Sequence, residues 1–360
     1  MLVAARTDVG KVRTTNEDAL AVKDLASGDQ IDAATTSALD VQERGVLLAV
    51  SDGMGGHQAG EVASALVLES LQTAMQQASL QPGTKGRIHE QLEEAVLRAN
   101  STVLTAARAE NRRGMGATLT AVFVRGREAY IAEVGDSRGY LLRNGRLRQI
   151  TRDQSLVQLM VDHGVMSAEE AKHSASKNVI LQAMGLAADV RVAIARLELR
   201  RGDRILLCSD GVTNEIPDDD LKEILIGSEP RAACDSMIAT ANERGGRDNQ
   251  TAIVADLTGD GLDPPDEFET VTSTYEVLQA FEGSIGGPPS PAPAAGPVPA
   301  AAVAAIEALP DLPSDPTPPR NAGNAGETQR LPRMGASWKT VAVVAVILVV
   351  LLVLMVLLTG

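Results

Sequence analysis

Acidic residues recur just after short apolar runs in the first 250 residues of this 360-residue chain. Asp52 lies two residues beyond the run Val46–Val50, and Asp210 lies two residues beyond Ile205–Cys208. Such runs are typical of buried strands, so the core would hold each backbone while the carboxylate reaches the sheet edge. Several carboxylates at one edge repel one another unless a hard divalent cation, which prefers oxygen ligands, neutralises them. The pattern therefore predicts a metal centre built from carboxylates.

The composition excludes several classes of function. A formal net charge of -14 and an aromatic content of 2% argue against nucleic acid as a partner, because phosphates require clustered basic side chains and bases require stacking platforms. The spacing of Cys208 and Cys234 fits neither a zinc site nor a disulfide framework, and the four histidines are scattered. No apolar stretch of signal-peptide length begins the sequence, so we expect no export and a cytoplasmic catalytic domain.

The segment Val341–Leu358 is an unbroken apolar run without charge. As a helix it would be about 27 Å long, which matches the hydrocarbon core of a bilayer. Trp338 precedes the run where an interfacial aromatic is expected. Three basic residues on the same side favour a cytoplasmic location for that side: Arg330, Arg333 and Lys339. We therefore expect residues 337–360 to form a single-pass C-terminal transmembrane tail anchor in the cytoplasmic membrane.

Residues 258–336 are rich in proline, alanine and glycine. A segment of this composition cannot bury enough surface to fold, so we expect a disordered linker that acts as a semi-extended tether. The pattern leaves the short stretch Tyr275–Phe281 unassigned.

Residues 1–257 alternate strand-like and helix-like patterns and are expected to form the catalytic domain. Apolar residues at helical spacing predict long helices over Glu61–Ala78 and from Ile88 to Val103. Asn144-Gly145 suits a tight hairpin turn, and hairpins imply antiparallel sheet. The pattern predicts an α+β fold with helices outside antiparallel sheets. Strands are expected at Ala117–Val124, Ala129–Val134, Gly139–Leu142, Arg191–Leu197, Asp203–Cys208 and Thr251–Asp256.

Six motifs follow one another in a particular order between Ala4 and Asp256. They are Arg13-Thr14-Thr15-Asn16-Glu17-Asp18, Asp52-Gly53-Met54-Gly55-Gly56-His57, Gly116-Ala117-Thr118, Gly135-Asp136-Ser137-Arg138, Cys208-Ser209-Asp210-Gly211 and Arg247-Asp248-Asn249. In this order the motifs resemble the metal-dependent protein phosphatase family, the type 2C serine/threonine phosphatases, in its bacterial form.

The resemblance implies a four-layer α-β-β-α sandwich of two antiparallel sheets flanked by helices, with two Mn²⁺ or Mg²⁺ ions at one end. Asp52 would bridge both ions, assisted by the carbonyl of Gly53. Asp210 and Asp248 would hold one ion, and Glu17 would hold the other directly or through water. A third, weaker ion would use Asp136, together with Asp210.

The same resemblance assigns supporting and substrate-binding residues. Arg13 would bind the substrate phosphate, for which a planar guanidinium offers a bidentate grip. Asp18 and Asn249 would support the ligands through hydrogen bonds. Some family members carry a histidine proposed as general acid where this chain has Met54. His57 is therefore a candidate acid, although a structural role at a helix start fits it equally well.

The chain also departs from the family pattern at both ends of Asp153–Val179, a segment that corresponds to a flap bordering the family's site. Members usually have Asp-His-Ser where this chain has Asp153-Gln154-Ser155. They often have Thr-Arg-Ala-Leu-Gly where it has Leu181-Gln182-Ala183-Met184-Gly185. These changes leave the expected metal ligands intact and bear on substrate contacts.

Two cations about 3.5–4 Å apart can activate a bridging water and clamp a phosphate. The resemblance thus implies a phosphatase that hydrolyses phosphomonoesters of phosphoserine and phosphothreonine proteins, with a serine/threonine kinase among the expected substrates, and the apolar tail would tether it to the membrane. Two alternatives stay open. One is a partner-switching phosphatase dedicated to one anti-sigma antagonist, which a sensor domain would favour. The other is a catalytically silent metal-binding scaffold, which the loss of a core ligand would favour.

Overall fold

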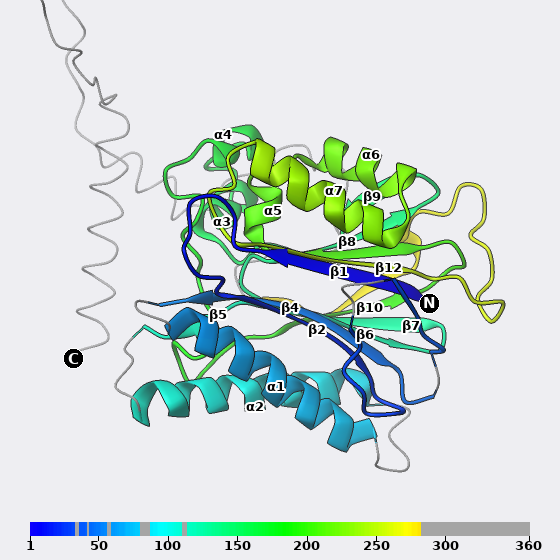
Figure 1. Ribbon diagram of the computed structural model, residues 1–360, viewed down its shortest axis with the longest axis horizontal. Helices are drawn as coiled ribbons and strands as arrows, with labels where there is room; N and C mark the ends of the chain where they lie inside the picture. Colours follow the sequence, from blue (N-terminus) through cyan, green and yellow to red (C-terminus); the bar gives the residue numbers. More distant parts are fainter. Residues whose placement is uncertain (33–35, 42, 56–58, 80–86, 110–113, 282–360) are drawn as a thin grey trace, which may run out of the picture. The chain divides into compact units, whose positions relative to one another are not determined.

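Two antiparallel sheets lie face to face, and helices cover both outer faces (Figure 1). The structure is a computed structural model that describes residues 1–32, 36–41, 43–55, 59–79, 87–109 and 114–281. Within this part, the layers follow the order helix, sheet, sheet, helix, as expected from the sequence. The second sheet carries α1 and α2, whereas α5, α6 and α7 cover the first (Figure 1).

The first sheet has the strand order β3-β1-β12-β11-β8-β9, and the second has the order β13-β10-β7-β6-β4-β2, with β5 paired to β4. The first sheet comprises β1 (Leu2–Asp8), β3 (Ser37–Ala38), β8 (Arg138–Arg143), β9 (Arg146–Gln149), β11 (Arg204–Cys208) and β12 (Gln250–Asp256). The second comprises β2 (Asp18–Asp24), β4 (Val46–Met54), β5 (Gly116–Ala117), β6 (Leu119–Arg125), β7 (Glu128–Val134), β10 (Ala193–Glu198) and β13 (Tyr275–Gln279). The helices are α1 (Ala59–Ser79), α2 (Ile88–Ala109), α3 (Leu156–Asp162), α4 (Ala168–Lys172), α5 (Asp210–Thr213), α6 (Asp218–Gly227), α7 (Pro230–Glu243) and the 3₁₀ turn η1 (Val271–Ser273).

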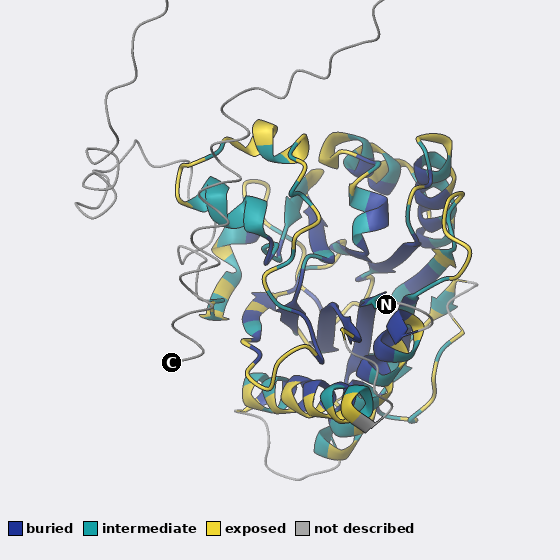
Figure 2. Ribbon diagram, turned by 90° about the vertical axis from the view of Figure 1, so that its left-hand side faces the viewer, coloured by how far each residue is buried: buried dark blue, intermediate teal, exposed yellow. Residues whose placement is uncertain are grey.

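Strand β4 shows why its apolar run is unbroken. Val46, Leu48 and Val50 face the interface between the two sheets, whereas Leu47 and Ala49 pack beneath α1 and α2. Because a strand turns successive side chains to opposite faces, a strand covered on both faces must be apolar at every position. Figure 2 shows the result: the sheets and the inner sides of the helices are buried, and the outer sides of the helices are exposed.

The hairpin expected at Asn144-Gly145 joins β8 to β9. Asn144 has φ 50° and Gly145 has φ 68°, which are the left-handed values that a two-residue turn of this type requires. The two long helices and the strands expected from the sequence are confirmed, and most of their ends lie within three residues of the expected positions.

The expected transmembrane segment 337–360 lies outside the described residues. Among the residues that the structure does describe, none of the helices is both long and apolar enough to cross a bilayer.

Residues 258–281, here called the C-terminal strap, pack on the domain and differ from the expected linker that begins at residue 258. Tyr275–Gln279 forms β13, which extends the second sheet beside β10. Val271 is 4% exposed and belongs to the core between the sheets. At the far end of the strap, Gln279 Nε2 donates to Glu93 Oε1 of α2 at 2.8 Å.

The boundary expected after residue 257 is therefore wrong: Leu262 and Val271 of the strap pack in the core, and long-range polar contacts add to them. The first half of the strap is rich in Asp, Gly and Pro, which is typical of a linker. Glu269 nevertheless accepts hydrogen bonds from Arg200 Nε at 3.1 and 3.0 Å, and Thr274 O accepts from Glu198 N at 2.9 Å. Such long-range pairs leave no periodic signal in the sequence.

The strap covers a buried ion pair at the end of β8. Arg143 and Asp203 are 2% and 1% exposed, and Nε and Nη2 of Arg143 contact the two carboxylate oxygens at 2.7 and 2.6 Å. Arg143 also donates to Thr274 Oγ1 at 2.6 Å and to the carbonyl of Glu198 at 2.9 Å. This bidentate geometry satisfies both charges and joins β8, β10 and the strap.

We predict that Arg143→Met lowers the free energy of unfolding by about 3–5 kcal/mol, because it leaves the Asp203 carboxylate buried without its counter-charge. Arg127→Met is the matched control, since its ion pair with Asp263 is 54% and 65% exposed and should contribute less than about 1 kcal/mol. Urea unfolding followed by circular dichroism measures both values. Equal losses in the two variants would contradict a structural role for the buried pair.

Candidate metal centre

The antiparallel registers bring the acidic motifs to one end of the sandwich. In the second sheet, Asp18 at the start of β2 is directly opposite Asp52 near the end of β4. In the first sheet, β11 ends just before Asp210, and its partner β12 begins just after Asp248. Asp136 follows the end of β7 at the same end. Residues up to 230 positions apart in sequence thus converge because neighbouring strands run in opposite directions.

Asp18 is held by hydroxyl groups from the opposite sheet. Its Oδ2 accepts hydrogen bonds from Ser209 Oγ at 2.7 Å and from Thr251 Oγ1 at 2.6 Å. Its Oδ1 is buried and has no hydrogen-bond partner among the described residues. Asp18 is 9% exposed, so this carboxylate joins the two sheets from a nearly dry position.

Asp52 is positioned by a network of buried hydroxyls behind β4. Its N–H donates to Thr118 Oγ1 at 2.9 Å, and Thr118 N donates back to the Asp52 carbonyl at 2.8 Å. Thr118 Oγ1 also lies 2.8 Å from Ser137 Oγ. Ser51 Oγ donates to the carbonyl of Thr118 at 2.6 Å. The backbone beneath the Asp52 carboxylate is therefore fixed from the β5–β6 and β7–β8 connections.

Glu17 directly precedes β2 and lies against the first turn of α1. Its carbonyl accepts from Ser64 Oγ at 2.6 Å and from Gly53 N at 3.1 Å, and its own N–H donates to Asn249 Oδ1 at 2.8 Å. A Cβ atom at Gly60 would lie only 2.8 Å from Glu17 Oε1. The absence of a side chain at Gly60 thus lets the first turn of α1 approach the Glu17 carboxylate.

Asp210 and Asp248 come from two segments in close contact. A Cβ atom at Gly211 would lie 1.9 Å from the Asn249 carbonyl oxygen, so glycine is required there. Asp210 is the first residue of α5; its Oδ2 accepts from Asn214 Nδ2 at 2.9 Å, and its Oδ1 is buried with no partner in the described part of the chain. Asp248 Oδ1 accepts from Asn249 N at 2.9 Å.

Arg13, the expected phosphate-binding residue, reaches the same place. Its Nη2 donates to Asp248 Oδ2 at 2.8 Å, and the two side chains are 48% and 31% exposed. Burial opposes the charge of Arg13, but Asp248, Glu17 and Asp52 together raise its pKa. Arg13 is therefore a partly exposed cation at the edge of this group of carboxylates, where an anion could reach it.

Burial and mutual repulsion disfavour the ionised forms of these acids. Burial raises the pKa of Asp18 to about 7, with Asp210 and Asp248 adding to the rise against the hydrogen bonds from the hydroxyls. Burial raises the pKa of Asp52 well above its usual range, and Asp18 and Asp210 are the strongest like charges on it. The pKa of Asp136 is raised in the same way by burial and then by Asp210.

The side chains do not form a finished coordination sphere. Across the described residues, no three His, Cys, Asp or Glu side chains are arranged to hold a metal ion. Asp248 turns to Arg13, and Asp18 turns to two hydroxyls. The donor set nevertheless fits hard cations, because two buried carboxylate oxygens, Asp18 Oδ1 and Asp210 Oδ1, have no hydrogen-bond partner there and all the ligands are oxygens. A divalent cation would satisfy both atoms and offset the repulsion.

With the exception of His57, the expected site residues thus come together. Glu17, Asp18, Asp52, Gly53, Asp210, Asp248 and Asn249 lie around one another with Arg13 at the edge, and Asp136 interacts electrostatically with Asp210. His57 lies outside the described residues, so its role as an acid stays a prediction.

Three of the four hydroxyl residues that position the acids stand in the motifs named above, but the sequence assigned a role to none of the four. Thr118, Ser137, Ser209 and Thr251 are each at most 2% exposed. The only local signal is a hydroxyl residue at the end of an apolar run, next to or opposite an acidic motif, and that signal is common in turns.

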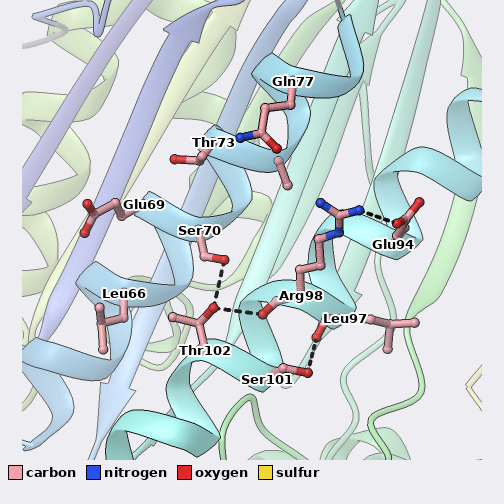
Figure 3. Close-up of a pocket in the computed structure, with 11 residues that line it drawn as sticks. Leu66, Glu69, Ser70, Thr73, Gln77, Glu94, Leu97, Arg98, Ser101 and Thr102 are labelled. Atoms are coloured by element: carbon pink, nitrogen blue, oxygen red, sulfur yellow. Dashed lines mark hydrogen bonds and ion pairs between the residues drawn. The ribbon is translucent and has the colours of Figure 1, made fainter. Parts of the chain in front are cut away.

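A groove of about 690 Å³ lies between α1 and α2, but it contains none of these acids (Figure 3). Polar side chains such as Ser70, Thr73 and Thr102 line much of it, and Arg98 is paired with Glu94 (Figure 3). It therefore plays no part in the candidate metal centre.

Comparisons with known proteins agree with this arrangement. A family model for protein phosphatase 2C matches residues 20–249. The serine/threonine protein phosphatase PstP of Mycobacterium tuberculosis is 38% identical over 255 residues, which cover 71% of this chain and 44% of the relative. The serine/threonine phosphatase stp of Listeria monocytogenes is 36% identical over 262 residues, which cover 72% of this chain and 97% of the relative.

Solved structures give the same result. A crystal structure of the M. tuberculosis phosphatase PstP/Ppp matches with a TM-score of 0.61 at 37% identity and covers 72% of this chain and 99% of that one. The catalytic domain of PstP in complex with two manganese ions matches with a TM-score of 0.59 at 37% identity, over 72% of this chain and the whole of that chain. The sandwich, the ordered acidic motifs and these matches together establish that the chain belongs to the protein phosphatase 2C family.

Proposed function

We propose that the protein is a metal-dependent serine/threonine phosphoprotein phosphatase that hydrolyses phosphomonoesters. The observation that carries this proposal is the group of buried carboxylates, which includes two oxygens without hydrogen-bond partners, beside a partly exposed arginine. That combination suits a site that binds cations first and a phosphate second. The names of the relatives, and the two manganese ions in the PstP complex, support it.

The residues have distinct roles in this proposal. Two Mn²⁺ or Mg²⁺ ions, when bound, would supply a nucleophilic water at neutral pH and neutralise charge on the phosphoryl oxygens. Asp52 would bridge the pair with the Gly53 carbonyl, Asp210 and Asp248 would hold one ion, and Glu17 would hold the other. Asp18 and Asn249 fix the backbone and the side chains around these ligands. Asp136 with Asp210 would hold a third, weaker ion.

Arg13 would orient the substrate. Its guanidinium has five N–H donors, and only Nη2 is engaged with Asp248, so the others can grip two phosphoryl oxygens. In the metal-free protein the ion pair with Asp248 keeps this side chain at the edge of the site.

The cellular setting is part of the proposal. The apolar run Val341–Leu358 would anchor the chain in the cytoplasmic membrane, with residues 1–281 in the cytoplasm and the rest of the linker between them. Anchoring raises the local concentration of the enzyme towards membrane-associated phosphoproteins. We propose phosphoserine and phosphothreonine proteins as substrates, among them a serine/threonine kinase.

The Asp52→Asn variant should lose more than about 100-fold of the manganese-stimulated turnover of p-nitrophenyl phosphate, because changes to outer partners of metal ligands already cost about 10–100-fold. Asp260→Asn, a change at an acidic residue of the strap away from the site, is the control and should retain activity. No turnover in the parent protein, or full turnover in Asp52→Asn, would favour the silent scaffold instead.

The raised pKa of Asp18 leads to a prediction about stability and pH in metal-free protein. A carboxyl group whose folded pKa is about 7 binds more protons when folded, so its contribution to stability is lost as pH rises from about 4 through 7. Asp18→Asn removes this loss. The melting temperature of Asp18→Asn relative to the parent should therefore increase between pH 5 and pH 8 in the presence of a chelator. A constant difference across that range would show that Asp18 does not titrate there.

The anchor is tested by fractionation. The full-length protein should sediment with membranes and resist a high-salt wash, whereas a chain that ends at Pro332 should be recovered in the soluble fraction, because it lacks the apolar run. A shorter deletion within the linker, of residues 290–298, serves as the control and should stay with the membranes. Persistence of the Pro332-terminated chain in the membrane fraction would refute the anchor.

A further inference from the structure

The flap of residues 153–179 is tied to the domain at a short two-stranded base. Leu156 N donates to the Val179 carbonyl at 2.8 Å, and Leu181 N donates to the Gln154 carbonyl at 2.7 Å. Ser155 and Ile180 face each other across this base as an antiparallel bridge. The position of the whole flap therefore depends on what holds residues 154–156 and 179–182 in place.

Gln154 ties this base to the loop that carries Asp136. Its Oε1 accepts from Gly135 N at 2.8 Å, and its own N–H donates to the Gly135 carbonyl at 2.8 Å. Its Nε2 donates to the carbonyl of Glu133 at 3.1 Å. The side chain is 1% exposed, so these bonds are shielded from water and each is costly to break.

Gln182 closes the other side of the base. Its Nε2 donates to Gln154 Oε1 at 2.7 Å and to the Arg191 carbonyl at 2.6 Å, and its Oε1 accepts from Arg191 N at 3.1 Å. One amide thus bonds both the entry of the flap and the chain that leads to β10. Gln154 Oε1 accepts two hydrogen bonds, which its two lone pairs allow.

The contacts continue to the centre of the site. Gly135 directly precedes Asp136, and the next residue, Ser137, contacts Thr118 Oγ1 at 2.8 Å. Thr118 Oγ1 in turn accepts from Asp52 N at 2.9 Å. A continuous series of buried hydrogen bonds and peptide links therefore runs from the flap base to the backbone of Asp52.

The two glutamines are also among the positions at which this chain departs from the family pattern, with histidine and arginine as the usual residues. Their side chains contact each other directly. Gln154→Met would leave the buried N–H of Gly135 without its acceptor, whereas Gln182→Met would remove one of the two hydrogen bonds to Gln154 Oε1 and both bonds to the Arg191 backbone.

We propose that Gln154 and Gln182 are positioning residues that form a latch, which fixes the flap base against the Gly135–Asp136 loop and so sets the flap over the substrate. The proposal rests on the proposed function, because the flap matters for turnover only if the site hydrolyses phosphoproteins. On this proposal the peptide part of a phosphopeptide would reach the flap, whereas p-nitrophenyl phosphate has no such part. Release of the latch should therefore affect the peptide more.

The first test measures the latch itself by amide hydrogen exchange on metal-free, full-length protein. In Gln154→Met and in Gln182→Met, exchange at peptides that contain Gly135 and Leu181 should quicken by about 5- to 10-fold, the ratio expected for the loss of one buried hydrogen bond. The double variant should exchange no faster than Gln154→Met, because both changes open the same latch. Gln91→Met, on α2, is the matched control and should leave these peptides unchanged.

The second test measures turnover with manganese. Gln182→Met should raise KM for a phosphothreonine peptide by about 10-fold and change kcat/KM for p-nitrophenyl phosphate by less than about threefold.

The outcomes separate the two proposals. Unchanged exchange at Gly135 and Leu181 in both single variants would overturn the latch, as would equal kinetic losses on the peptide and on p-nitrophenyl phosphate. Because exchange is measured without metal or substrate, failure of the parent protein to hydrolyse either substrate would remove the proposed function and leave the exchange result decisive for the latch. Gln182 is partly exposed, so its variant tests the proposal even if Gln154→Met does not fold.

Discussion

Repulsion among buried carboxylates at one end of the sandwich is the constraint around which the rest of the structure is arranged. Asp18, Asp52, Asp210 and Asp136 lose most of their hydration there, and Asp18, Asp210 and Asp136 all raise the pKa of Asp52. The strands hold them together because their backbones belong to two sheets that the core keeps in register. This arrangement lowers the free energy of unfolding, so other parts of the fold must supply the missing stability. A bound cation would offset part of the loss.

The opposite end of the sandwich shows a contrasting use of charge. There Arg143 and Asp203, at 2% and 1% exposed, are more deeply buried than Asp18 at 9%, but each charge has its counter-charge and further hydrogen bonds. Because β8 begins beside the Asp136 loop and ends at Arg143, one strand links the end with the repelling carboxylates to the end with the paired charges. The strap shields the Arg143–Asp203 pair from water, which strengthens the ion pair.

The acids could be predicted from sequence, whereas their supports could not, and the reason is the range of the interactions. Asp52 and Asp210 each follow an apolar run, so a window of ten residues is enough to place them at a sheet edge. Ser209 acts on Asp18 across 191 residues of chain, and only the pairing of strands brings the two together. The prediction of a linker from residue 258 was wrong for a similar reason, because the attachment of the strap depends on partners such as Arg200 that lie far away in sequence. The composition indicated a polar segment, but it did not indicate that this segment packs on the domain.

Arg13 brings together the electrostatics of the site and its proposed chemistry. A phosphate that enters must overcome repulsion from the acids, and the arginine is the cation among the described residues that lies at their solvent-facing edge. Its ion pair with Asp248 is only partly buried, so exchanging one oxygen anion for another there costs little. Once cations hold Asp248 and its neighbours, the carboxylate no longer needs the guanidinium, and more of its donors become available to the phosphate. Metal binding would thus prepare the substrate site through this one side chain, in keeping with the proposed order of cation first and phosphate second.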